Sequence, residues 1–436
     1  MNLNALDFLS QDQINQLKDG INQTFTSLNT SIGNQVFAEQ FPLIGNNLKD
    51  AFDSGITSIQ YLKALRDAIE TGLNTLTGNA SYTVTQVQSG INTALQNAGI
   101  SGLGVTVTPS GNDFKLNFNT KESFVPVTIA LENDLGLPNL GLKTSGSAKS
   151  ALDYTFNFGV GLDSTGFYFD TSPTSSQLQI KTATTIPNFN ANASLSLLNF
   201  TATDSTGTHS AFNANIDVAF KDPNNDNKLR TAELAGSPDL LNATISKGNA
   251  NINLNLLSAL PSNVPLPKFG TNLNVLWNLD GVSINPLDNN ATFGSIPTIS
   301  FNNNTINIGS FFSTVTGQFL NKINMVTSPI KPILDILTTP IPLLSDLGDS
   351  KVTLLDIFGV SQSQASAIKG LSDIANLAST VANFTNYNNE YIDLGSLSVN
   401  GDLRSDLLIN SAVSTTRSLS TNQNIDLKSF LSNVKP

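Results

Sequence analysis

Residues 154–162 read YTFNFGVGL, and this stretch decides the fold class because apolar residues alternate with small or polar ones along it. Successive side chains of a β-strand point to opposite faces, so period-two alternation places Tyr154, Phe156 and Phe158 on one face. The same alternation occurs in four further segments, at 114–118, 212–220, 250–256 and 273–279. Strands with one apolar and one polar face are typical of antiparallel sheets with one solvated side.

Turn sequences support this interpretation. Asp280-Gly281 stands between two alternating segments and predicts a two-residue hairpin. The turn sequence at 163–166, Asp-Ser-Thr-Gly, recurs at 204–207 and predicts related hairpins at both places. His209 then lies in a solvated hairpin loop, while Trp277 alternates with apolar residues and is expected in the core.

The first hundred residues follow a helical period. Apolar residues from Ile14 to Val36 step by 3, 4, 4, 3, 4 and 4, an eleven-residue repeat that suits one long, nearly straight helix. Phe41-Pro42 ends it, a second helical pattern runs from Leu48 to Leu76, and a third from Val84 to Leu95. Residues 11–99 are therefore predicted as helical.

The C-terminal third repeats a short strand-like motif. Residues 306–311 (INIGSF) resemble 392–397 (IDLGSL), and the segment between them, 311–387, carries apolar stripes at helical spacing. We therefore predict an α+β protein, with one-sided antiparallel sheets covered by an N-terminal helical region and by a C-terminal helical insertion. The predicted divisions are a helical region at 1–100, a β region at 101–305, a strand–insertion–strand region at 306–400 and a C-terminal segment at 401–436.

Composition narrows the classes of function. The chain has 436 residues, a net charge of −11, one His and no Cys, and 13% of its residues are charged. About 25% is usual, so Asn, Ser and Thr must solvate much of the surface. Disulfides, thiol nucleophiles, Cys-ligated zinc and His-cluster metal sites are excluded. An acidic chain without a Lys/Arg run argues against nucleic acid as a partner, and no carboxylate spacing singles out a catalytic pair. We do not predict an enzyme.

Two features bear on location. The first seven residues lack the positive and apolar regions of a secretory signal. The most apolar segment, 326–347, contains Lys331, Asp335, Asp346 and four prolines, which would leave unpaired backbone groups in lipid. We therefore expect neither an N-terminal leader nor a membrane span.

One segment carries metal chemistry. Residues 222–233 read DPNNDNKLRTAE, which places side-chain oxygens at positions 1, 3, 5 and 12 of a twelve-residue loop. This is the spacing of an EF-hand loop, in which position 7 adds a carbonyl and a bidentate Glu completes the calcium shell. Leu229, at position 8, is the apolar residue that such loops turn inward. The predicted calcium ligands are Asp222, Asn224, Asp226, the Lys228 carbonyl and Glu233.

The loop departs from the EF-hand pattern in three ways. Position 6 is Asn227 where EF-hands have Gly, although Asn also tolerates a positive φ. Position 9 is Arg230, which cannot bind a cation and must turn away. A strand, not a helix, enters the loop, and residues 236–238 (GSP) cut the exit helix short. The alternative is an ordinary Asn/Asp turn without an ion.

Three stretches carry a family resemblance: residues 41–45, residues 161–171 together with 220–224, and residues 308–311 together with 329–347. They resemble modules of very large, calcium-binding secreted or cell-surface proteins of bacteria, notably cyanobacteria, of adhesin-like type. The resemblance implies an extracellular, calcium-rich setting and a structural or adhesive role. Such proteins usually carry Asp-Gly within the loop, so Asp226-Asn227 implies a lower affinity.

We thus predict a calcium-stabilised structural or adhesive module, with other surface modules or extracellular matrix as partners. The alternative is a carrier of lipid or another apolar ligand, in which a sheet–helix groove is lined by Phe311, Phe312, Phe319 and Ile323. Those residues also suit core packing, because every docked helix needs an apolar stripe. An enzyme is the third possibility.

Overall fold

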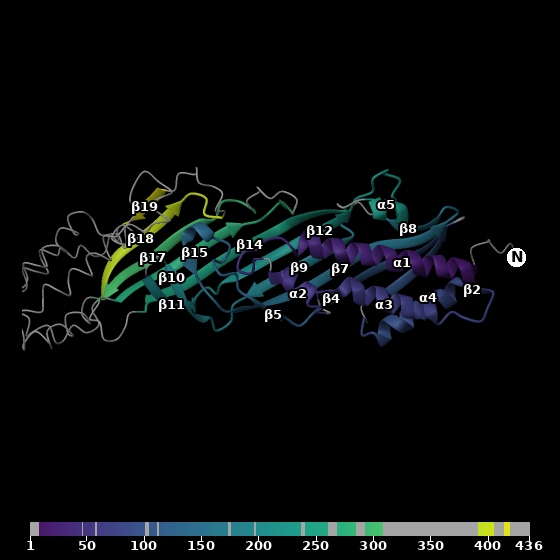
Figure 1. Ribbon diagram of the computed structural model, residues 1–436, viewed down its shortest axis with the longest axis horizontal. Coiled ribbons are helices and arrows are strands. Elements are labelled where there is room, and N and C mark those ends of the chain that lie inside the picture. The colour runs from purple at the N-terminus through teal and green to yellow at the C-terminus, as the bar shows by residue number, and fades with distance from the viewer. Residues whose placement is uncertain are drawn as a thin grey trace, which may run out of the picture.

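A computed structural model describes most of the chain before residue 308 and two segments after residue 390. The described residues are 8–45, 47–56, 59–100, 104–110, 113–172, 176–195, 198–236, 240–259, 268–284, 293–307, 391–404 and 414–418. They form an elongated α+β structure in which helices lie on a large antiparallel sheet (Figure 1). The predicted fold class is therefore confirmed.

The first helix, α1 (Gln11–Ser31), begins where the periodic apolar pattern begins. The Ser10 side chain accepts a hydrogen bond from the Gln13 N–H, and the Gln13 side chain accepts one from the Ser10 N–H. This reciprocal pair satisfies backbone donors that a helix start leaves open. A π-helical turn at Ile32–Val36 continues α1, which confirms the long first helix.

The second helical pattern forms two helices instead of one. A turn separates α2 (Asn47–Asp53) from α3 (Tyr61–Asn74), and Gly55 takes a φ of 81° within it. Such a φ favours glycine. The third pattern is confirmed by α4 (Val84–Asn97). Before it, β2 (Ser81–Thr83) pairs with β1 (Phe8–Ser10), so a short strand interrupts the region predicted as helical.

The other seventeen strands of the described residues form one sheet, and every pairing in it is antiparallel. They are β3 (Gly104–Ser110), β4 (Asp113–Ser123), β5 (Val127–Ala130), β6 (Leu142–Lys143), β7 (Ser147–Asp163), β8 (Gly166–Asp170), β9 (Leu178–Thr185), β10 (Asn190–Leu195), β11 (Leu198–Asp204), β12 (Ala211–Phe220), β13 (Lys228–Arg230), β14 (Leu241–Ser258), β15 (Lys268–Asn278), β16 (Val282–Ile284), β17 (Thr298–Asn307), β18 (Tyr391–Asn400) and β19 (Ser414–Ser418). The short helices are Pro138–Leu140 and α5 (Thr231–Gly236).

Two long strands organise this sheet. The 17-residue β7 pairs with β4 and β5 along one edge and with β8 and β9 along the other. The 18-residue β14 pairs with β11 and β12 on one edge and with β15 and β16 on the other. Pairing of β9 with β12 joins the two halves. In Figure 1 the helices cover the β7 half, and β14, β15, β17 and β18 extend beyond them.

The hairpin predicted at Asp280-Gly281 is wrong. The flanking strands β15 and β16 do not pair with each other; both pair antiparallel with β14, so they run in the same direction. Gly281 has the positive φ of a turn, 75°, but the Asp280 carboxylate accepts a hydrogen bond from the Gly248 N–H of β14 at 2.7 Å. The turn therefore connects two strands that follow one another along the same edge of β14.

The two Asp-Ser-Thr-Gly turns also differ from each other. The first, 163–166, is the predicted hairpin, because β7 and β8 pair across it. The second, 204–207, is not a hairpin, because β11 and β12 both pair with β14 and continue in one direction. At this second turn the Asp204 carboxylate accepts from the Ser210 N–H at 2.8 Å and contacts the exposed His209 ring.

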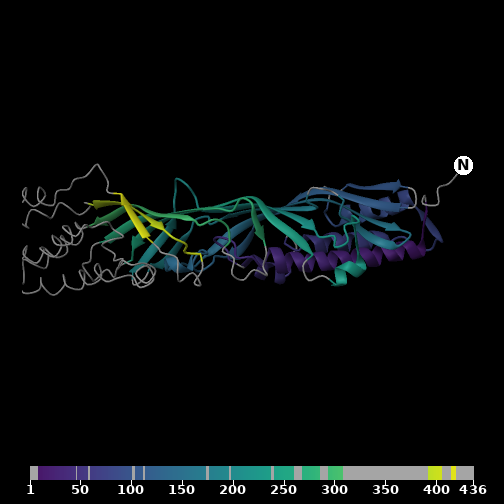
Figure 2. The same cartoon turned by 90° about the horizontal axis from the view of Figure 1, so that it is seen from above.

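Helices and sheet share one apolar core. Burial alternates along β12, β14 and β15, as one-sided strands require. Phe25 of α1 packs edge-on against Phe158 of β7, with ring centroids 5.5 Å apart. Figure 2 shows α1 along one face of the sheet. The predicted packing of the N-terminal helical region on the strands is confirmed, and so is the core position of Trp277.

Part of the predicted C-terminal organisation is described. The strands expected beside the insertion are β17 and β18, which pair from Asn307 and Tyr391 onward. Residues 308–390 lie outside the described residues, and with them the helical insertion and the proposed groove residues Phe311, Phe312, Phe319 and Ile323. Among the described helices, none is long and apolar enough to cross a lipid bilayer.

The shared core makes a first prediction. Phe25→Ala should lower the free energy of unfolding by about 3–5 kcal/mol, because it leaves a cavity between α1 and β7. Val125→Ala, at a side chain that is 84% exposed, should change it by less than about 0.5 kcal/mol. Urea denaturation followed by circular dichroism measures both. An unchanged Phe25→Ala transition would contradict a core shared by helix and sheet.

Candidate metal centre

The predicted calcium loop follows β12 and includes β13 and the first residues of α5. Within the loop, β13 pairs antiparallel with β8, and Leu229 stands opposite Phe169. Leu229 is fully buried, as predicted for position 8, and Leu234 of α5 is buried too. The short helix α5 packs against α1, so core residues anchor both the strand within the loop and the helix at its end.

Side-chain oxygens fold back into the loop. The Asp222 carboxylate accepts hydrogen bonds from the N–H groups of Asn225 and Asn227, at 3.0 and 2.6 Å. Asn224 and Asp226 each accept one from the N–H two residues further on, at 3.0 and 2.8 Å. Three of the predicted ligand side chains therefore curl toward the same turn of backbone.

Two asparagines supply the backbone conformation of this turn. Asn225 and Asn227, at positions 4 and 6, have φ values of 60° and 64°. A positive φ is unfavourable for most residues, and Asn tolerates it because its side chain bonds locally. The expectation that Asn227 takes a positive φ, where EF-hands have glycine, is confirmed.

The Lys228 carbonyl lies on the loop side of β13. Thr171 N–H donates to the Asn227 carbonyl at 3.0 Å, so residues 171 and 227 form a hydrogen-bonded pair. Bonded and non-bonded pairs alternate in an antiparallel ladder. The backbone groups of Lys228 therefore point away from β8, and its N–H does reach Asp226 at 2.8 Å. This is the direction that a position-7 ligand needs.

Glu233, the predicted ligand at position 12, has a backbone hydrogen-bond partner. Its Oε2 accepts a hydrogen bond from the Arg230 N–H at 2.7 Å, three residues earlier, which caps the start of α5. Across the described residues no group of three or more His, Cys, Asp or Glu side chains is gathered to hold a metal. The residues fit calcium in type, spacing and backbone direction, and the Arg230 N–H bonds to Oε2 of Glu233.

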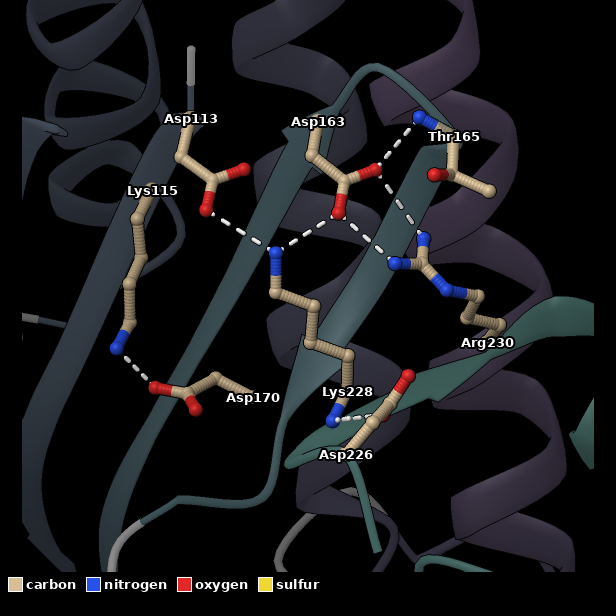
Figure 3. A network of polar contacts seen from close by, with 8 residues as sticks. All are labelled: Asp113, Lys115, Asp163, Thr165, Asp170, Asp226, Lys228 and Arg230. Atoms are coloured by element: carbon tan, nitrogen blue, oxygen red, sulfur yellow. Dashed lines mark hydrogen bonds and ion pairs between the residues drawn. The ribbon is translucent and has the colours of Figure 1, made fainter. Parts of the chain in front are cut away.

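The two cationic residues of the loop turn outward, as expected for Arg230. Its Nη1 and Nη2 donate to the two oxygens of Asp163, at 3.3 and 2.8 Å. Lys228 Nζ donates to Asp163 at 2.8 Å and to Asp113 at 3.1 Å (Figure 3). Asp163 belongs to the β7–β8 turn and Asp113 begins β4, so these contacts tie the loop to the sheet.

Two glycines on the polar face of β7 make room for the rest of this network. Gly161 lies under the Tyr168 ring, where a Cβ atom would come 2.5 Å from the ring, and Lys228 Nζ lies 4.2 Å from the centroid of that ring. Gly159 lies under Lys115, which forms an ion pair with Asp170 (Figure 3). Three cations and three carboxylates thus cover this end of the sheet.

The network shifts the pKa values of its members. Burial disfavours the charged form of Asp163, but hydrogen bonds from Arg230 and Lys228 outweigh it and hold the pKa of Asp163 below its usual value. Burial also disfavours the charged form of Asp170, but the hydrogen bonds from Lys115 and Ser172 together outweigh it and lower the pKa of Asp170. Burial, with the nearby carboxylate of Asp113, raises the pKa of Tyr168 to about 12.

The network around the loop was not predicted from the sequence. Arg230, at position 9, was expected to turn away from the ion, but its acceptor Asp163 was not predicted. The available signals were the glycines at 159 and 161 on the polar side of an alternating strand, and the Asp that opens the 163–166 turn.

Comparison of the chain with protein-family profiles, with curated proteins and with solved structures finds no match in any of the three.

The lowered pKa of Asp170 predicts a pH dependence. A carboxyl with a lower pKa in the folded state stabilises that state above its unfolded pKa, about 3.9, and this stabilisation is lost as pH falls below it. Asp170→Asn should cost about 1.5–3 kcal/mol at pH 7 and flatten the loss of stability below about pH 4. Urea melts between pH 2 and 7 measure this, with exposed Asp19→Asn as the control. Equal acid sensitivity of both variants would contradict it.

Proposed function

We propose that this chain is a calcium-stabilised structural or adhesive module of a bacterial surface or extracellular protein. The observation that carries the proposal is the loop 222–233, where the spacing of an EF-hand calcium loop coincides with inward-folded oxygens at Asp222, Asn224 and Asp226. In the proposed site these three side chains, the Lys228 carbonyl and Glu233 hold the ion. Carboxylate, amide and carbonyl oxygens are the ligands that calcium prefers.

The surroundings of the loop favour a locking role over a sensing role. EF-hand sensors respond to calcium by changing the angle between two helices. Here the loop is entered from a strand, β13 pairs with β8 of the sheet, and α5 packs against α1. A bound ion would link β12, β13 and α5, which already pack on the rest of the structure.

The polar face of the sheet supports the proposed setting. On the outer side of β14 and β15, asparagines stand opposite one another, and the Nδ2 groups of Asn272 and Asn274 donate to the Oδ1 atoms of Asn255 and Asn253. Neutral amides in place of charges keep this face hydrated with little dependence on ionic strength. We propose other surface-protein modules or extracellular matrix as its partners.

Calcium should raise the melting temperature of the protein. Binding to the native state adds RT ln(1 + [L]/Kd), about 1.4 kcal/mol when calcium is tenfold above Kd, and loops in extracellular modules have Kd values of about 10⁻⁴–10⁻³ M. Thermal melts from chelator to several millimolar calcium, with titration calorimetry, measure the effect. Magnesium should raise the melting temperature little, because it prefers a smaller octahedral shell.

The deciding variant is Glu233→Gln. Glutamine still accepts the hydrogen bond from the Arg230 N–H, so the start of α5 keeps its cap, but the bidentate carboxylate is gone. The calcium-induced rise should vanish in this variant and persist in Glu70→Gln, which removes a carboxylate from α3. An unchanged melt of the unmodified protein, with no binding heat, would show that the loop is an ordinary Asn/Asp turn.

A further inference from the structure

We propose that the Asp163–Arg230 ion pair sets the calcium affinity of the loop, with Arg230 weakening and Asp163 strengthening the binding of the ion. The inference rests on the proposed calcium site and names the residues that tune it. Only one member of the pair, Arg230, belongs to the loop; Asp163 comes from the turn between β7 and β8.

Arg230 places a permanent positive charge beside the loop carboxylates. Hydrogen bonding to Asp163 is the main reason that its pKa is raised, and the charges of Asp226 and Glu233 act in the same direction. Its backbone N–H also holds the Glu233 carboxylate at 2.7 Å. In the calcium-free loop the guanidinium therefore offsets part of the repulsion among the acidic ligands. A bound divalent cation would meet the same charge as a repulsion.

Asp163 acts in the opposite direction. Its carboxylate accepts hydrogen bonds from both Nη groups of Arg230 and from Nζ of Lys228. Its Oδ1 also accepts one from the Thr165 N–H at 2.8 Å. Its side chain is only 12% exposed, so water screens its charge incompletely. Asp163 thus adds a negative charge near the loop and holds the ends of both cationic side chains beside the β7–β8 turn (Figure 3).

The two halves of one ion pair should therefore have effects of opposite sign. Arg230→Gln removes a positive charge and should tighten calcium binding. Asp163→Asn removes a negative charge and releases Arg230 and Lys228, so it should weaken binding. If the pair were only a structural brace, both variants would break the same contact and change the affinity in the same direction.

Calcium chloride titrated into the full chain by calorimetry tests this at low ionic strength. Relative to the unmodified protein, Kd should fall by about 3–10-fold in Arg230→Gln and rise by a similar factor in Asp163→Asn, the range expected for one unit charge about 6–12 Å from a divalent ion in a water-like dielectric. Arg230→Lys, which keeps the charge, should stay within about twofold. Both differences should shrink in about 1 M KCl, where the screening length is near 3 Å.

Thermal melts give a second reading that does not require both variants to fold. In chelator, Arg230→Gln should melt below the unmodified protein, because the acidic ligands lose their counter-charge, and calcium should then raise its melting temperature by more. A loss that is equal with and without calcium, or shifts of Kd in the same direction for Arg230→Gln and Asp163→Asn, would overturn the inference alone. Absence of calcium binding in every variant would overturn both the inference and the proposed function.

Discussion

The need to cover one apolar sheet face shapes most of this molecule. The strands β7 and β14 each carry apolar side chains along most of one side. Such a row is stable only against another apolar surface. In the β7 half that surface comes from the N-terminal helices. The eleven-residue period of α1 suits this task, because it keeps an apolar stripe on one side of a nearly straight helix. Small residues such as Gly20, which lies against the Phe167 ring, bring helix and sheet close together.

The opposite face of the same sheet follows a different rule, because it must stay hydrated in a chain with few charges. Over β14 and β15 it does so with asparagines that bond to one another across strands. At the β8 end, where the loop 222–233 lies, charged side chains are concentrated instead, and each positive side chain pairs with a carboxylate. The loop thus occupies the part of the polar face with the strongest local electrostatics, and Asp163 is the residue shared by both cations of the loop.

Local patterns predicted the elements of this structure, and pairing partners far along the chain decided what the patterns could not. The alternation at 154–162 and the spacing from Ile14 to Val36 fixed a strand and a helix, because burial on one face requires those periods. Asp280-Gly281 predicted a turn correctly and a hairpin wrongly, since a turn sequence does not state whether the next strand pairs with the previous one or with β14. The loop residues were predictable from twelve consecutive letters. Asp113 and Asp163 were not, because only the folded sheet brings them to Lys228.

The end-to-end placement of strands along β7 and β14 has a mechanical consequence. Each long strand pairs with two shorter strands on each edge. The break between the two short strands on one edge falls at a different position along the long strand from the break on the other edge. Tension along the strand direction then loads many backbone hydrogen bonds at once in shear. Because the breaks on the two edges of a long strand are at different positions, the described sheet has no single row across which both edges are interrupted. At the segments 205–210 and 279–281 the ladder on the adjoining edge of β14 is interrupted, and hydrogen bonds such as those from Ser205 to Asn253 and from Gly248 to Asp280 bridge the interruption. Such a sheet resists being pulled lengthwise far better than being peeled from its edge.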